Sequence, residues 1–119
     1  MSDYLFAYGT LQPGFAPDEV AEVAAKLRPA GRGFVYGELY ELSGYLGVVP
    51  DPKSKNRITG TVLELPENAD VLRQLDEYEG YDPQDIETSE FVRVRQIVEL
   101  SGGGTLECWI YRYNREPRA

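Results

Sequence analysis

The strongest constraint on the fold is a pair of alternating segments near the end of the chain, separated by a run of glycines. Apolar side chains lie on one side of residues 91–100, as expected for a strand with one buried face. The run Ser101-Gly-Gly-Gly104 supplies a flexible turn, and a second apolar segment follows at residues 105–113. We therefore expect a β-hairpin, which commits this part of the chain to a sheet. The buried face of its first strand is expected to comprise Val92, Val94, Val98 and Leu100.

Shorter segments upstream are expected to extend this sheet. In residues 3–8 the aromatic side chains alternate with Leu5 and Ala7, so the two sets should face opposite sides of a strand. Apolar and β-branched residues bounded by turn residues predict further strands. These are residues 33–42, 45–49 and 58–65.

Two helices are expected between the strands. The first opens at Pro17-Asp18-Glu19, includes Arg28 in its last turn and is ended by Pro29. The second begins within residues 66–70 and ends at Gly80. Two helices and short strands with hairpin-like connections predict an α+β domain with a mostly antiparallel sheet. Glycines inside strands indicate bulges or bends that would allow the sheet to close into a small barrel. These are Gly37, Gly47 and Gly60.

Size and charge limit the possible classes of function. The chain has 119 residues, so we expect residues 1–119 to form a single domain. The formal net charge of -8 argues against a nucleic-acid or anionic-membrane surface, because both require basic patches. No apolar run approaches the roughly 18–20 residues that span a membrane, and no signal-peptide pattern is present. We therefore expect a cytoplasmic protein with a small-molecule partner, of open oligomeric state.

The sequence contains no histidine, which removes the commonest acid–base side chain. Ser-His-Asp and Cys-His catalysis are excluded, as are the usual zinc sites that combine histidine with cysteine. A calcium-loop pattern is missing as well, so we expect neither a metal nor another cofactor. The single Cys108 alternates with Leu106 and Ile110 and is expected to be a core residue. Acid–base chemistry must therefore come from Asp, Glu, Tyr, Lys or this cysteine.

Glu79 is the candidate acid–base residue. On a helix, Leu72, Leu75 and Glu79 share one face, so the carboxylate lies with the apolar side chains. Gly80 is the expected left-handed residue after the helix, which places Glu79 beside unpaired carbonyl groups at the negative end of the helix dipole. Desolvation and the dipole should both raise the pKa of this carboxyl group. The alternative is a solvated acid that contributes only to solubility, and the neighbouring Asp76 and Glu77 are interpreted as supporting or solvent-facing charges.

The candidate binding segment is Tyr8-Gly9-Thr10-Leu11, where the first strand ends. Successive backbone N–H groups at such a turn can form a concavity that binds a carboxylate or a phosphate. It is not a phosphate loop, because the Gly-x-x-x-x-Gly-Lys-Ser/Thr pattern is missing. The alternative is an ordinary exit from a strand. Arg93 and Arg95, opposite the valine face, are interpreted as strand-surface charges rather than as substrate clamps.

Several motifs occur in an order that is typical of one family. They are Phe6-Ala-Tyr-Gly-Thr-Leu11, Gly37-Glu-Leu-Tyr40, Tyr45-Leu-Gly-Val-Val-Pro50, Gly60-Thr-Val-Leu-Glu-Leu65, Leu75-Asp-Glu-Tyr-Glu79 and Cys108-Trp-Ile-Tyr111. Together they resemble the gamma-glutamylcyclotransferase-like family, also called AIG2-like, over nearly the whole chain. The resemblance implies a small, mostly antiparallel β-barrel with flanking helices and a cavity at one end.

The resemblance also implies roles for the two candidate segments. In the family, the motif that corresponds to Tyr8-Gly9-Thr10-Leu11 binds the carboxylate end of the substrate, and the glutamate that corresponds to Glu79 handles the proton. The implied reaction cyclises the γ-glutamyl group of a small γ-glutamyl amine or amino-acid amide to 5-oxoproline. It needs no metal and no covalent nucleophile, because the substrate's own α-amine attacks. One departure is Phe91-Val-Arg93, where many relatives carry Tyr-x-Arg.

The sequence leaves three classes of function open. The same fold could serve as a non-catalytic module that binds a small acidic or γ-glutamyl-like ligand, with Glu79 as a hydrogen-bond partner only. A third possibility is an interaction domain whose cavity is incidental. An enzyme with Glu79 as general acid and base is the leading hypothesis, and its substrate within the γ-glutamyl class is open.

Overall fold

The computed structural model describes residues 3–9, 18–42 and 45–114 of the chain. Within these residues, strands and helices follow the order expected for an α+β protein. The strands are β1 (Tyr4–Ala7), β2 (Arg28–Leu42), β3 (Tyr45–Pro50), β4 (Arg57–Glu64), β5 (Phe91–Leu100) and β6 (Thr105–Tyr113). The helices are α1 (Asp18–Ala24), α2 (Ala69–Glu79) and the short 3-10 helix η1 (Ile86–Thr88).

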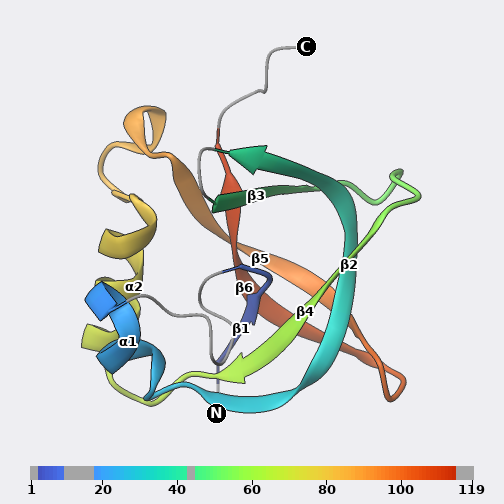
Figure 1. Cartoon of the computed structure of the whole chain (residues 1–119), viewed down its shortest axis with the longest axis horizontal. Helices are drawn as coiled ribbons and strands as arrows, with labels where there is room; N and C mark the ends of the chain where they lie inside the picture. Colours follow the sequence, from blue (N-terminus) through green and yellow to red (C-terminus); the bar gives the residue numbers. More distant parts are fainter. Residues whose placement is uncertain (1–2, 10–17, 43–44, 115–119) are drawn as a thin grey trace.

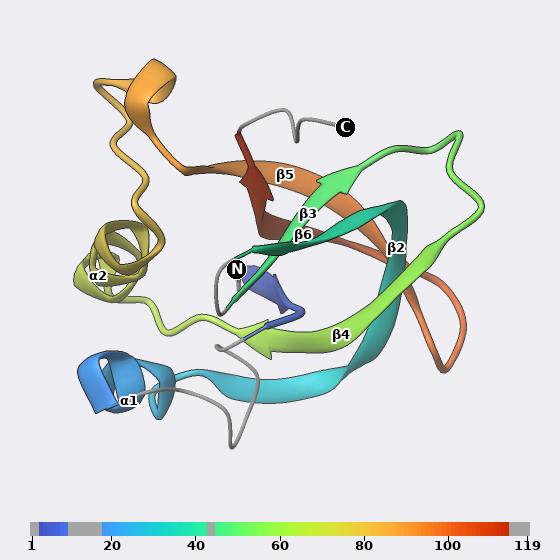
Figure 2. The same cartoon turned by 45° about the horizontal axis from the view of Figure 1, so that its top comes forward.

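The strands form a closed barrel. The pairing order β2-β4-β1-β6-β5 is closed by contact between β2 and β5, and β3 pairs with the far end of β2 as an additional strand. All of these pairs are antiparallel except β1 with β6. Figure 1 and Figure 2 show the strands wrapped around one centre, with α1 and α2 side by side on one flank. The expected mostly antiparallel barrel with flanking helices is confirmed.

The barrel has an apolar interior and a second core between its wall and the helices. Alternation along β1 divides its residues between the two, with Phe6 in the interior and Leu5 in the outer core. Tyr8 packs against the interior cluster and Ala7 belongs to the outer one, as the sequence pattern predicts. The interior cluster comprises Phe6, Val35, Val48, Ile58, Val62, Val98, Cys108 and Ile110. The outer cluster comprises Leu5, Ala7, Val23, Leu27, Leu63, Leu65, Val71, Leu75, Phe91 and Tyr111.

Glycines allow neighbouring strands to approach one another closely. A Cβ atom on Gly60 would collide with the carbonyl oxygen of Ala7, and one on Gly37 would lie 2.6 Å from the carbonyl oxygen of Val49. Of the expected bulges or bends, bulges are absent at Gly37 and Gly60, because the register of the strand pairs described runs evenly through them. The register shift lies between Pro29 and Gly31 instead. Close packing of backbones, rather than bulging, explains glycine at Gly60 and Gly37.

The first helix is shorter than its sequence pattern predicts. It ends at Ala24, and a tight turn follows in which the amide of Leu27 donates to the carbonyl of Ala24. Arg28 and Pro29, expected at the end of this helix, instead begin β2 and pair with the last residues of β4. Strand pairing therefore outweighs the local helical pattern. No helix among the described residues is long and apolar enough to cross a bilayer.

Candidate active site

Helix α2 holds the candidate carboxylate at its last residue. The helix starts at Asn68, whose side chain accepts a hydrogen bond from the amide of Asp70. It ends at Gly80, which is left-handed with φ 74°. The amides of Gly80 and Tyr81 then donate to the carbonyls of Glu77 and Asp76, which is a Schellman motif. The stop predicted at Gly80 is confirmed, and it fixes Glu79 in the final helical position.

Glu79 is turned toward the protein rather than toward solvent. Leu75, one turn earlier, is fully buried, and Leu72 packs on the same outer core. Glu79 itself is partly buried, whereas Glu77 is exposed. Burial raises the pKa of Glu79 from 4.5 to about 7. The carboxyl group therefore changes between its charged and neutral forms near neutral pH, which suits proton transfer.

Tyr8, which follows β1, lies within electrostatic range of Glu79. Its hydroxyl donates a 2.6 Å hydrogen bond to the carbonyl oxygen of Tyr111 on β6. Burial raises the pKa of Tyr8 well above its ordinary value, and the charge of Glu79 raises it further. This electrostatic coupling shows that the structure brings together Tyr8 and Glu79, which are far apart in the sequence.

The rest of the candidate binding segment is described only in part. Gly9 follows Tyr8 directly, and a Cβ atom placed on Gly9 would meet no heavy atom within 4 Å. Among the described residues, a side chain at this position would therefore meet open space. Thr10 and Leu11, the other two residues of the predicted segment, lie outside the described residues.

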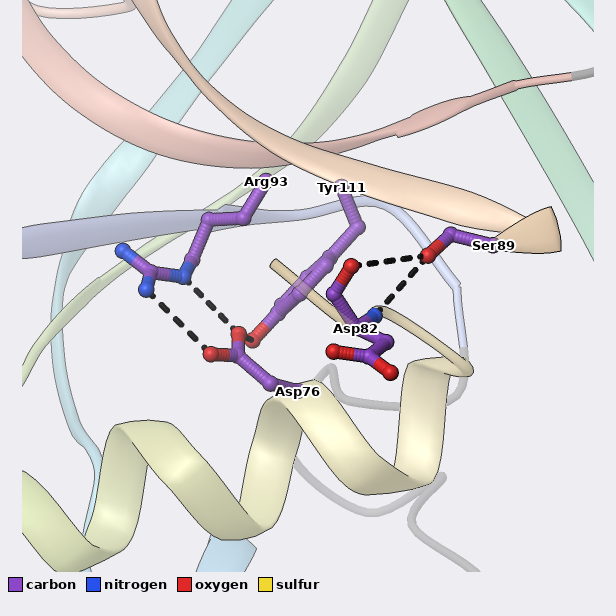
Figure 3. Close-up of polar contacts among 5 residues, drawn as sticks. All are labelled: Asp76, Asp82, Ser89, Arg93 and Tyr111. Carbon is purple, nitrogen blue, oxygen red and sulfur yellow. Dashed lines mark hydrogen bonds and ion pairs between the residues drawn. The ribbon is translucent and has the colours of Figure 1, made fainter. Parts of the chain in front are cut away.

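A buried ion pair anchors α2 to the barrel wall. Arg93 on β5 donates to both carboxylate oxygens of Asp76, with distances of 2.8 Å from Nε to Oδ1 and 3.2 Å from Nη2 to Oδ2. The hydroxyl of Tyr111 donates to the same Oδ1 at 2.7 Å. Figure 3 shows the three side chains meeting between the helix and the strands. The pKa of Tyr111 is strongly raised, first by burial and then by its hydrogen bond to Asp76.

Sequence reasoning missed this ion pair. Asp76 was expected to be a supporting or solvent-facing acid, and it is 8% exposed. Arg93 was expected to be a surface charge, and it is paired and partly buried. A signal was available in the hairpin, because a turn at residues 101–104 places Arg93 opposite Tyr111. The two side chains are paired rather than solvent-facing because α2 covers this face of the hairpin.

Two other predictions on the hairpin are confirmed. Cys108 is fully buried in the barrel interior, and burial raises the pKa of its thiol to about 11. Arg95 is an exposed strand charge whose guanidinium lies 4.0 Å from the centre of the Trp109 ring. The guanidinium of Arg93 lies over the same ring at 4.3 Å. Both contacts are cation–π interactions that hold the arginines against the sheet.

The loop after α2 is held in place by its own hydrogen bonds. The buried Ser89 hydroxyl accepts from the amide of Asp82 at 2.8 Å and lies within hydrogen-bond distance of the Asp82 carbonyl oxygen (Figure 3). It also lies within hydrogen-bond distance of the carbonyl oxygen of Asp85. The amide of Glu90 donates to the carbonyl of Gly80, which connects the end of the helix to the start of β5. This loop therefore holds the C-terminal end of α2 in place, in addition to the ion pair of Asp76 with Arg93. Among the described residues, no cluster of three or more Cys, Asp or Glu side chains is arranged to hold a metal ion.

The fold and this site define a class of protein: a small mixed β-barrel with a partly buried carboxylate at a helix end, within electrostatic range of a tyrosine at a strand end. The family model described as gamma-glutamyl cyclotransferase, AIG2-like, matches residues 5–119. The chain belongs to this family. Among curated proteins, none matches the chain significantly.

Solved structures share the fold at low sequence identity. An AIG2-like protein from Mus musculus superposes with a TM-score of 0.75 at 21% identity, over 98% of this chain and 80% of that chain. YkqA from Bacillus subtilis gives a TM-score of 0.71 at 23% identity, over 96% of this chain and 36% of that chain. A structure described as gamma-glutamyl cyclotransferase gives 0.67 at 16% identity, over 95% of this chain and 67% of that chain. These similarities show the fold.

Proposed function

We propose that this protein cyclises the γ-glutamyl group of a small γ-glutamyl amine or amino-acid amide to 5-oxoproline and releases the amine, with Glu79 as general acid and base. The observation that carries the proposal is the position of Glu79: it ends a helix, is partly buried, has a pKa raised to about 7 by burial and lies within electrostatic range of Tyr8. Membership of the gamma-glutamyl cyclotransferase family supports it.

The reaction needs only proton transfer and positioning from the protein. The α-nitrogen of the substrate attacks its own side-chain carbonyl carbon, a lactam C–N bond forms, and the original amide C–N bond breaks. In total the α-nitrogen loses two protons and the leaving nitrogen gains two. Glu79 as a carboxylate accepts one proton from the α-nitrogen, and as a carboxylic acid it returns one to the leaving nitrogen. The other proton of the α-ammonium group goes to solvent, and the released amine takes its second proton from solvent. With a pKa of about 7 it has access to both forms at neutral pH.

Positioning supplies the remainder of the rate enhancement. In favourable intramolecular reactions, correct alignment of two groups contributes about 7–11 kcal/mol. We assign this task to residues 8–11, whose backbone would hold the substrate's carboxylate while the α-nitrogen faces Glu79. The open space beside Gly9 among the described residues is consistent with this assignment. Tyr8 is uncharged at neutral pH, as an ordinary tyrosine is, and burial raises its pKa further, so it does not repel an acidic substrate.

The test is product formation with a matched pair of variants. The wild type, Glu79→Gln and Glu77→Gln are each incubated with γ-glutamyl amines and γ-glutamyl dipeptides, and 5-oxoproline is measured. We expect the wild type and Glu77→Gln to form product at similar rates, because Glu77 is exposed on the same helical turn. We expect Glu79→Gln to lose at least about 100-fold, in the range for a general acid–base residue.

Two outcomes would contradict the proposal. Equal rates for the wild type and Glu79→Gln would remove Glu79 from the chemistry. Thermal stabilisation by a γ-glutamyl compound that is afterwards recovered intact would indicate a binding module without turnover.

A further inference from the structure

We propose that Asp76 is a positioning residue for Glu79: it fixes α2 against the barrel through Arg93 and Tyr111, and it compensates the positive charge of Arg93 close to the acid–base carboxylate. This inference rests on the proposed function of Glu79. Asp76 would touch neither substrate nor reacting atoms. It would act through the position and the electrostatic environment of the residue three places after it.

The contacts of Asp76 are those of a structural anchor. Its carboxylate accepts two hydrogen bonds from Arg93 and one from Tyr111. The side chains of Asp76 and Arg93 are only 11% and 17% exposed. A two-pronged pair of this kind restricts the orientation of both partners as well as attracting them. Asp76 is therefore held in one place relative to β5 and β6.

The same contacts continue from α2 to the predicted binding segment. Tyr111 donates its hydroxyl to Asp76 and accepts, through its backbone carbonyl, the hydroxyl of Tyr8. Asp76 and Glu79 are three residues apart on α2 and therefore neighbours on its surface. A continuous path of hydrogen bonds thus connects the helix that carries Glu79 with the strand end that carries Tyr8 and Gly9. Loss of Asp76 would disconnect the two halves of the site.

Ionisable side chains from three strands join α2 in one hydrogen-bonded network. Asp76 lies on the same helix, Arg93 comes from β5, Tyr8 from β1 and Tyr111 from β6. The pKa of Tyr111 responds to Asp76, Arg93 and Glu79 together, so these groups share one electrostatic environment. The shift at Glu79 itself arises from burial. No charge effect adds to this shift, and we attribute this to cancellation between the opposite charges of Asp76 and Arg93.

Removing the charge of Asp76 or of Arg93 should leave the charge of the other residue uncompensated. In Asp76→Asn, the guanidinium of Arg93 has no compensating anion and should favour the charged form of Glu79. In Arg93→Gln, the anion of Asp76 is uncompensated and should favour the neutral form. The double variant removes both charges. Its Glu79 should therefore titrate as in the wild type, even if the protein is less stable.

The experiment is a titration of the Glu79 carboxyl carbon by NMR in substrate-free protein, with the signal assigned from its absence in Glu79→Gln. We expect the midpoint to fall by about one pH unit in Asp76→Asn, to rise in Arg93→Gln, and to return in the double variant. Arg95→Gln is the control, because this exposed arginine lies over the same tryptophan ring. It should leave the midpoint unchanged.

The outcomes separate this inference from the proposed function. An unchanged midpoint in both single variants, or a shift that persists in the double variant, would overturn the role of Asp76. If Asp76→Asn does not fold, Arg93→Gln still tests the inference through a shift of opposite sign. Because the titration needs no turnover, a shifted midpoint in a protein that forms no 5-oxoproline would refute the proposed function and leave the charge compensation standing.

Discussion

At the scale of a single residue, the fold keeps Glu79 in an environment that penalises its charge. The folded pKa of about 7 exceeds the ordinary 4.5 because of burial. Between these two values the folded protein binds more protons at this site than the unfolded chain, so stability falls as the pH rises. The penalty is absent below about 4.5 and complete above about 7.

The first prediction is that Glu79→Gln is more stable than the wild type at pH 8. Glutamine removes the buried charge, and the expected gain is about 1–3 kcal/mol, reduced from the full shift because the side chain is partly exposed. At pH 5 the gain should be much smaller. Thermal unfolding at the two pH values measures it. Glu77→Gln, an exposed neighbour, should show no such pH dependence. An equal gain at both pH values would mean that Glu79 titrates normally.

Sequence reasoning at this scale succeeded for Glu79 and failed for Asp76. The inward direction of Glu79 follows from its spacing to Leu72 and Leu75 and from the helix stop at Gly80. The ion pair of Asp76 with Arg93 depends on which strand the helix covers. Periodicity within a segment gives the face of a side chain but does not identify the partner on another segment.

At the scale of the element, the end of α2 decides where Glu79 lies. Gly80 has φ 74°, a conformation that other residues adopt at a penalty of about 1 kcal/mol. A Cβ atom there would lie 3.6 Å from Glu90 Cβ, an ordinary contact, so backbone conformation is the main obstacle to substitution. The glycine therefore holds the preceding carboxylate in place.

The second prediction is that Gly80→Ala lowers the stability by about 1 kcal/mol and also lowers kcat for 5-oxoproline release, because the last turn that carries Glu79 shifts. Thermal unfolding and the product assay measure the two effects. Gly102→Ala in the hairpin turn is the control, since a Cβ atom there has no neighbour within 4 Å and the backbone is not left-handed. Loss of stability with unchanged kcat would separate the helix end from the chemistry.

The helices and strands show where the local sequence pattern is sufficient to predict the bounds of an element. The bounds expected for β5 and β6 match the structure, because alternation and a glycine turn are both local signals. The end of α1 was wrong by four residues, since Arg28 and Pro29 gain ladder pairs with β4 that the helical pattern does not anticipate. Element ends are thus set by tertiary pairing wherever two local patterns compete.

At the scale of the whole molecule, closure of the barrel requires strands to approach without side chains between them. A Cβ atom on Gly60 would collide with the backbone of Ala7 and lie 2.8 Å from the Phe6 ring. Gly60 therefore lies where β4 contacts β1, at the border of the barrel interior. The expectation of a barrel followed from such glycines and from the family resemblance. The parallel pairing of β1 with β6 was not predictable, because alternation does not reveal strand direction.

The third prediction is that Gly60→Ala destabilises the protein by about 1–3 kcal/mol, the range for overpacking. Urea unfolding should give a lower midpoint with an unchanged slope, which indicates loss of stability without a change of folded compactness. Thr59→Ala is the control, because Thr59 is the exposed neighbour on the same strand. A midpoint for Gly60→Ala equal to that of Thr59→Ala would show that the strands do not require this close approach.

The central claim is that Glu79, titrating near neutrality, carries the proton in a cyclotransferase reaction. The most direct measurement is the pH dependence of kcat/KM for 5-oxoproline release from the best γ-glutamyl substrate. Glu79 must be ionised to accept the first proton, so we predict that kcat/KM falls about tenfold per pH unit below a midpoint near 7. A kcat/KM that stays level from pH 8 down to pH 5 would contradict the account.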